Sequence, residues 1–234
     1  MYKSYDLLLI LYSATNNLPI DYSSGFKPGI FLFLLVILSF MPFIIMMLTS
    51  FVKYSVVFTI IKNAIGLQQI PPASVITGLS IVLTIFTMQP VAQKMYESVK
   101  EVFEKDNRQM KLDNIPDIIR AFDAAKPPLF EYLKKHSGKK EYQLFYEVGK
   151  TNLGKDSILI LAPAFVITQL KEAFVLGFKL FIPFLVIDLL VANLLVVLGL
   201  NMLTPVTISL PLKLLVFILS DGWYLITKNL LLNS

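Results

Sequence analysis

Long apolar stretches and one polar region alternate along the chain, and this pattern predicts helices rather than strands. Ile30 to Val52 is a run of 23 residues without a charge, long enough for a helix that crosses about 30 Å of hydrocarbon. Apolar residues continue to about residue 66, so a single helix from residue 30 would be about 55 Å long. We expect such a helix to kink, with Pro42 as the obvious place, or to be partly buried in protein.

A short polar turn separates this first apolar arm from a second arm, expected at about residues 73–93. Gly66 suits the C-terminal cap of the first helix, and a Pro–Pro pair permits entry into a new helix but not continuation of the old one. The predicted tip of this first hairpin consists of Gly66, Gln68, Gln69, Pro71 and Pro72.

The polar region, residues 94–157, holds 24 of the 37 charged residues of the chain, 13 of them basic and 11 acidic. Residues 94–105 are expected to continue the preceding helix with a charged face. Pro116, Pro127–Pro128 and Gly138 are expected to separate two or three shorter helices beyond it.

A second over-long helical pattern runs from residue 158 to residue 199, with Pro163 and Pro183 as expected kinks. A polar break follows, in which Pro205 and Pro211 are predicted to turn the chain. A return arm is expected from residue 212 to about residue 232.

The predicted fold is therefore all-α, with two long kinked helical hairpins and a small polar helical insert. The expected boundaries are an N-terminal segment at 1–29, the first hairpin at 30–93, the insert at 94–157 and the second hairpin at 158–234. The N-terminal segment resembles a weak signal peptide, and a segment that lies on a surface is the alternative. Four apolar arms place both termini and the insert on one side and the two tips on the other.

Composition assigns the chain to the membrane class, with 56% hydrophobic residues, 16% charged residues and a mean hydropathy of +0.69. The net charge of +5 does not indicate nucleic-acid binding, because no basic cluster is interleaved with aromatic residues. The absence of cysteine excludes disulfides, thiolate metal sites and a cysteine nucleophile. His136 is the single histidine, and no phosphate loop, metal-ligand spacing or nucleophile motif occurs. The sequence therefore predicts no cofactor and no enzyme.

Ionisable residues inside the apolar blocks are the sharpest candidates for function, because such groups rarely face lipid. Asp188 stands out, and it could serve as a proton relay or ion site, or as a polar tie between helices or subunits. The tie is the favoured interpretation, because no second carboxylate lies near it in the sequence. The residues expected to make such ties are Lys53, Lys171, Glu172 and Asp188.

Three long runs, residues 50–72, 180–199 and 204–223, resemble the FliP/SctR family, the core export-gate proteins of bacterial type III secretion. The resemblance implies a subunit that does no chemistry and that assembles as a homo-pentamer with a small two-helix subunit and one copy of a larger subunit. It also implies a closed conduit for unfolded secreted proteins in the basal body at the bacterial inner membrane. Phe51–Tyr54 resembles the injectisome branch more than the flagellar branch. An ion-coupled transporter of small solutes is the alternative function.

The resemblance also implies a pore seal after Gly199, where family members usually carry three consecutive methionines. This chain has Leu200, Asn201 and Met202 at those positions. Leu200, Met202 and Leu203 are expected to form the seal, with Asn201 turned toward a neighbour. Asp188 matches the family's aspartate and is expected to tie neighbouring subunits together.

Overall fold

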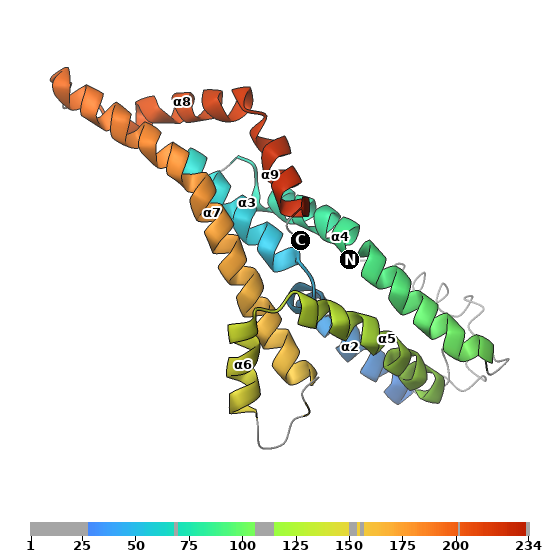
Figure 1. The fold of residues 1–234 in the computed structure, drawn as a ribbon. Helices are drawn as coiled ribbons and strands as arrows, with labels where there is room; N and C mark the ends of the chain where they lie inside the picture. Colours follow the sequence, from blue (N-terminus) through green and yellow to red (C-terminus); the bar gives the residue numbers. More distant parts are fainter. Residues whose placement is uncertain are drawn as a thin grey trace, which may run out of the picture. The chain divides into compact units, whose positions relative to one another are not determined.

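A computed structural model describes residues 28–67, 70–105, 115–149, 154, 157–200 and 202–232, and it confirms the all-α prediction. The described residues contain no strand. The helices are α2 (Pro28–Leu48), α3 (Phe51–Ile65), α4 (Ala73–Lys105), α5 (Ile115–Lys135), α6 (Lys139–Val148), α7 (Ile158–Val197), α8 (Pro205–Leu219) and α9 (Gly222–Leu232) (Figure 1). The chain divides into two compact units, Met1–Met41 and Pro42–Ser234, and the contacts described below lie within the second unit.

The first apolar arm breaks at Thr49–Ser50 rather than at Pro42, and the alternative expectation, that part of the arm is buried in protein, is met by α3. Pro42 lies inside α2, whereas the last turns of α2 and the whole of α3 meet at 72°. Side chains stabilise the break: the Thr49 hydroxyl donates to the carbonyl of Ile45 at 2.6 Å and accepts the amide of Phe51 at 3.4 Å. These bonds satisfy backbone groups that a helix leaves open at its ends.

The second apolar arm, α7, is one helix of 40 residues that continues through Pro163 and Pro183, the places expected for kinks. The return arm starts earlier than expected, because Pro205 occupies the first turn of α8 and Pro211 lies inside that helix. Only Pro205 therefore stands at the turn.

The return arm breaks instead between α8 and α9, which meet at 61°. Asp221 at this break has a φ of 51°, a left-handed conformation that non-glycine residues rarely adopt. Gly222 follows, and a Cβ there would lie 2.2 Å from the ring of Phe217. The close approach of this ring explains why a glycine stands at the break.

The described part of the polar insert contains two helices, α5 and α6, after α4 has continued to Lys105 as predicted. Gly138 separates them as expected and is the N-cap of α6. Pro127 and Pro128 do not separate helices, because both lie inside α5. The prediction of helix ends at these two prolines was wrong.

The short helix α3 is the centre of the fold, and it packs against α7, α4 and α8. One of its faces is completely buried, and the residues on it are Tyr54, Val57, Phe58, Ile61 and Ile65. α7 approaches this helix closely at Gly177, where a Cβ would lie 2.5 Å from Cδ1 of Ile60. Glycine at this position lets the two backbones come together. A second, smaller core joins α4, α5 and α7 around Leu133 and Phe165.

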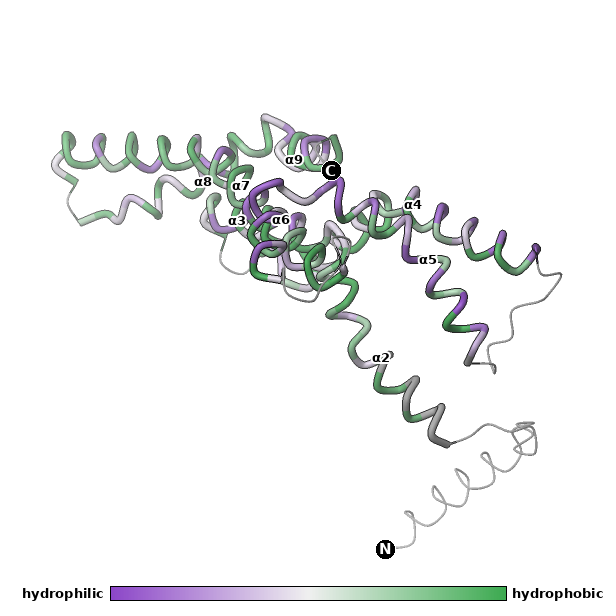
Figure 2. The backbone as a smooth tube through the Cα atoms, turned by 60° about the horizontal axis from the view of Figure 1, so that its bottom comes forward, coloured by the Kyte–Doolittle hydropathy of each residue, from purple (hydrophilic) through white to green (hydrophobic). Residues whose placement is uncertain are grey.

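Many large apolar side chains of α4, α7 and α8 are exposed. Figure 2 shows hydrophobic residues along much of α7 and α8. Two described helices, α4 and α7, are long and apolar enough to cross a membrane, and up to four spans result if each bent pair counts as one. A soluble monomer rarely exposes apolar patches of this extent. The surface therefore fits contact with lipid or with other subunits.

Candidate functional site

The tip between α7 and α8 projects beyond the ends of α3 and α4 (Figures 1 and 2). Gly199 ends α7 with a φ of 73°, and its amide bonds to the carbonyl of Val196 at 3.1 Å. The amide of Leu200 bonds to the carbonyl of Leu195 at 2.9 Å, which completes a glycine cap of the helix. Thr204 then caps α8 with Pro205 in its first turn. Local sequence signals thus fix a tight turn between two helices.

The residues predicted to form the seal lie in this turn with their side chains exposed. Met202 is 99% exposed, and Leu200 and Leu203 are 43% and 47% exposed. Asn201 lies outside the described residues. An exposed methionine flanked by two half-exposed leucines is an apolar surface on a small turn, and the structure brings these three residues together.

The residues predicted for the first hairpin tip lie between α3 and α4. Gly66 is the left-handed C-cap of α3, with a φ of 89° and an amide that bonds to the carbonyl of Asn63 at 3.0 Å. A Cβ on Gly66 would lie 3.6 Å from Leu210, so this tip packs against the middle of α8. Pro71 and Pro72 precede α4 directly. Gln68 and Gln69 lie outside the described residues.

Lys53 of α3 and Glu172 of α7 form an ion pair with 2.8 Å between Nζ and Oε2. The lysine side chain is only 2% exposed, whereas the carboxylate is 45% exposed. A buried ammonium requires an anionic or hydrogen-bonding partner, because its desolvation costs several kcal/mol. The pair therefore joins the central helix to the longest helix of the fold.

Asp188 of α7 pairs with Lys213 of α8, with 2.6 Å between Oδ2 and Nζ. The same ammonium donates to the carbonyl of Ala64 in α3 at 3.1 Å. Lys213 is 8% exposed and Asp188 is 40% exposed. One buried lysine thus connects three helices near the base of the tip. Within the chain Asp188 is an inter-helix tie, and its expected role between subunits stays a prediction.

Lys171 does not join Lys53 and Glu172 but reaches from α7 to Glu141 of α6, at 3.0 Å. The hydrogen bond from Lys171 holds the pKa of Glu141 below its usual range. Thr168, one turn earlier on α7, accepts the amide of Gly138 at 2.8 Å. These contacts fix the insert against the first half of α7.

The break between α2 and α3 is joined to the insert by a buried hydrogen bond between Ser50 Oγ and the Tyr132 hydroxyl, at 2.6 Å. Burial raises the pKa of Tyr132. The ring of His136 lies 4.6 Å from the ring of Tyr132, and burial together with Lys135 and Lys53 lowers the pKa of this histidine. His136 is therefore neutral at neutral pH and packs as an aromatic ring.

No group of three or more potential metal ligands occurs in the described part of the chain. Among the same residues, every buried side-chain nitrogen and oxygen atom has a hydrogen-bond partner. The polar groups named above are thus used for mutual contacts between helices. This arrangement holds helices in place.

The FliP family matches residues 34–230, which include most of α2, all of α3 to α8 and most of α9. The chain belongs to the FliP family. It is 40% identical over 209 residues to the Yop proteins translocation protein R of Yersinia pestis, a match that covers 85% of this chain and 93% of that protein. It is 37% identical over 204 residues to the flagellar biosynthetic protein FliP of Bacillus subtilis, covering 86% and 89%. It is 37% identical over 203 residues to the hypersensitivity response secretion protein HrcR of Ralstonia nicotianae, covering 83% and 92%.

Several polar contacts of this FliP-family chain were missed by the sequence reasoning. Lys213 was not among the residues expected to make polar ties, although it is the buried partner of Asp188. Its position on an otherwise apolar helix was the available signal. Glu141 and Tyr132 gave no such signal, because each lies in a region where polar residues are common.

Proposed function

We propose that the chain is a core subunit of a bacterial type III protein export gate and that its helices line a conduit for unfolded secreted proteins. The observation that carries the proposal is the match to the FliP family over almost every described helix. Relatives described as a translocation protein, a hypersensitivity response secretion protein and a flagellar biosynthetic protein support the same function. They favour protein export over the transport of small solutes.

The gate forms by association of several copies, five by the family resemblance, with a small two-helix subunit and one larger subunit. The extent of exposed apolar surface on α4, α7 and α8 supports this assembly, because these faces need lipid or protein to cover them. Two or more helices suited to crossing a membrane support a location in the bacterial inner membrane, within the basal body. The subunit positions cargo and does no chemistry.

The seal of the conduit is formed by the tips of neighbouring copies, through Leu200, Met202 and Leu203. Methionine is unbranched and flexible, so a ring of such side chains can adapt to a passing polypeptide and close again behind it. A narrow apolar ring also excludes water and ions when no chain is present. Exposure of 99% for Met202 in the single chain supports a role in contacts that only the assembly supplies.

The two buried ion pairs orient the tip within each copy. The Asp188–Lys213 pair holds α8 against α7 and α3, next to the helical segment from which the tip extends. The Lys53–Glu172 pair holds α3 against α7 at a position nearer the N-terminus of α7. Charged groups in these positions tie helices together without a proton-relay function.

Deletion of the gene in the host bacterium tests the proposal directly. Loss of all protein secretion through the type III pathway, restored by the wild-type gene, is the expected result. The complex purified with its partners should contain five copies of the chain, as counted by native mass spectrometry. Normal secretion in the deletion strain, or a chain that purifies only as a monomer or dimer, would contradict the proposal.

A further inference from the structure

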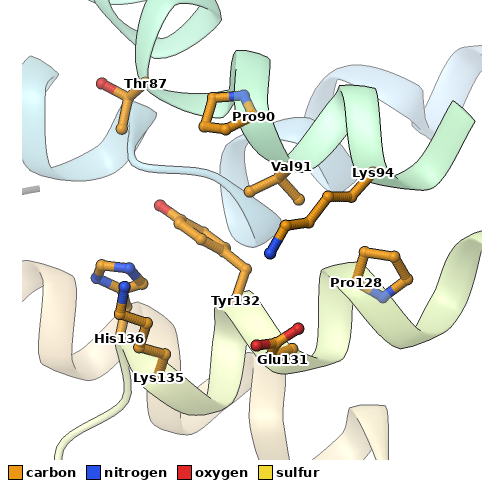
Figure 3. A pocket seen from close by; sticks show the side chains of 9 residues that line it. All are labelled: Thr87, Pro90, Val91, Lys94, Pro128, Glu131, Tyr132, Lys135 and His136. Atoms are coloured by element: carbon orange, nitrogen blue, oxygen red, sulfur yellow. The ribbon is translucent and has the colours of Figure 1, made fainter. Parts of the chain in front are cut away.

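A small pocket between α4 and α5, with charged side chains in its walls, has no part in the proposed gate. Figure 3 shows Lys94 reaching into it from α4, with Glu131, Tyr132 and Lys135 of α5 and His136, directly after α5, lining it. Its volume is about 240 Å³, and its remaining walls are Thr87, Pro90, Val91 and Pro128. The pocket is thus lined by two helices that are held in place by the second core.

The charges in this pocket differ from the other charges on the same helices. Lys100, Lys105 and Lys126 each pair with a carboxylate three or four residues away. Lys94 and Lys135, by contrast, make no ion pair with any described residue, and neither does Glu131. Two unpaired cations and one carboxylate give the pocket a net positive charge.

The walls of the pocket are already formed before any ligand enters. The Tyr132 hydroxyl is bonded to Ser50, and the Thr87 hydroxyl is bonded to Tyr54 at 2.6 Å. Two proline rings, Pro90 and Pro128, add rigid apolar surface. The donors that remain for a ligand are therefore the two lysine ammonium groups and the ring of His136, which is an arrangement suited to an anion.

The position along α4 indicates which kind of anion the pocket meets. Lys94 is the first charged residue of α4, after 21 residues without a charge. Ile85 and Phe86 on the preceding turns are 66% and 64% exposed, and Tyr96 just beyond is 69% exposed. The pocket thus lies where an exposed apolar helix becomes charged, with an aromatic residue at the boundary. Phosphate groups of lipids lie at such a boundary, and basic pockets between helices bind them.

We propose that the pocket lined by Lys94, Lys135 and His136 binds a phosphate group, carried by an anionic phospholipid or by a free phosphate. The two ammonium groups contact the phosphate oxygens from opposite helices, and Glu131 limits the charge of the ligand that is accepted. The bound phosphate fixes the polar end of α4 to α5. This inference concerns the insert and does not depend on the export function.

The test uses the full chain purified in detergent and titrated with phosphatidylglycerol or phosphatidylcholine, with bound lipid counted by native mass spectrometry. The double variant Lys94→Gln/Lys135→Gln should weaken phosphatidylglycerol binding by about tenfold for each lysine. The matched control Lys100→Gln/Lys105→Gln removes the same charge from α4 outside the pocket and should change binding less than about twofold. Circular dichroism should show the same helical content for both, because all four lysine side chains are exposed.

Competition with inorganic phosphate, at ionic strength matched with chloride, distinguishes the two sources of the phosphate group. Displacement of phosphatidylglycerol indicates a site that accepts free phosphate, and no displacement indicates a lipid site. Glu131→Gln should strengthen binding, because it removes the one negative charge in the pocket. Three results would each overturn the proposal. The first is an equal weakening of phosphatidylglycerol binding in the two double variants. The others are equal binding of the two lipids without any phosphate binding, and weaker binding of phosphatidylglycerol to Glu131→Gln.

Discussion

Replacing Asp188 by asparagine removes the charged partner of a buried lysine while it keeps the shape of the side chain. Lys213 is 8% exposed, and its ammonium then keeps only neutral acceptors, the carbonyl of Ala64 at 3.1 Å and the amide oxygen of the new asparagine. Loss of one partner from a fully buried pair costs about 3–5 kcal/mol, whereas exposed pairs contribute about 0.2–1 kcal/mol. Because Asp188 is 40% exposed, we expect Asp188→Asn to lower the free energy of unfolding by about 2 kcal/mol.

Replacing the other member of the pair, Lys213, should lower the free energy of unfolding by less. Lys213→Met keeps the apolar contacts of the lysine stem and leaves a carboxylate that water can reach, so we expect a loss of about 1 kcal/mol or less. The double variant should be more stable than Asp188→Asn alone, because no unpaired ammonium then remains buried. The pair Asp123–Lys126, with side chains 59% and 39% exposed, provides a control cycle in which the coupling should stay below about 1 kcal/mol.

The free energy of unfolding is measured for the wild-type chain, the two single variants and the double variant. Each detergent-solubilised chain is titrated with a denaturing detergent, and the loss of helical circular dichroism is followed. If the losses of the two single variants simply add in the double variant, the two residues are not coupled and the proposed tie is wrong. A larger loss of stability for Lys213→Met than for Asp188→Asn would also refute the reasoning. It would mean that the unpaired carboxylate of Asp188, and not the unpaired ammonium of Lys213, is the more costly charge.

Three further predictions concern packing, pH and the seal. Gly177→Ala should lower the free energy of unfolding by about 1–3 kcal/mol, because the new Cβ would lie 2.5 Å from Ile60. Adding Ile60→Val should recover part of this loss. The control Gly78→Ala should not destabilise the chain, because a Cβ at that position meets open space. The pKa of His136 is lowered in the folded state, so the free energy of unfolding should fall as the pH drops below about 6.5, and His136→Gln should reduce this dependence in pH-dependent unfolding measurements. Met202→Ala should increase the leakage of small ions through the assembled complex without reducing its abundance, and unchanged leakage would contradict the seal.

The arms of both hairpins could be predicted from the sequence because long uncharged runs leave few alternatives to helix. The places where they break could not be predicted from proline alone. Pro42, Pro163, Pro183 and Pro211 all lie inside helices. Besides the local bonds of Thr49, the sharp break at Thr49–Ser50 has a tertiary hydrogen bond between the hydroxyls of Ser50 and Tyr132, 82 residues apart. No local pattern contains that information.

The candidate site, too, could be predicted only in part from the sequence. Lys53, Glu172 and Asp188 were recognised because charges inside apolar blocks need partners, and the structure supplies a partner for each. Which partner each residue takes could not be predicted. Lys171 and Glu172 are adjacent in sequence, yet they point to different helices, Lys171 to Glu141 on α6 and Glu172 to Lys53 on α3. Adjacent positions on a helix face different directions, so the pairs follow from packing.

The most direct test of the gate is a photo-crosslinking residue placed at position 202 in the bacterium, with a secreted protein stalled in transit. Met202 is replaced because it is 99% exposed at the tip, and Val148, 77% exposed at the end of α6, provides the control position. We expect position 202 to form a covalent adduct with the stalled protein and position 148 to form none. Equal adducts at the two positions, or an adduct from position 148 alone, would contradict a conduit that is sealed by this tip.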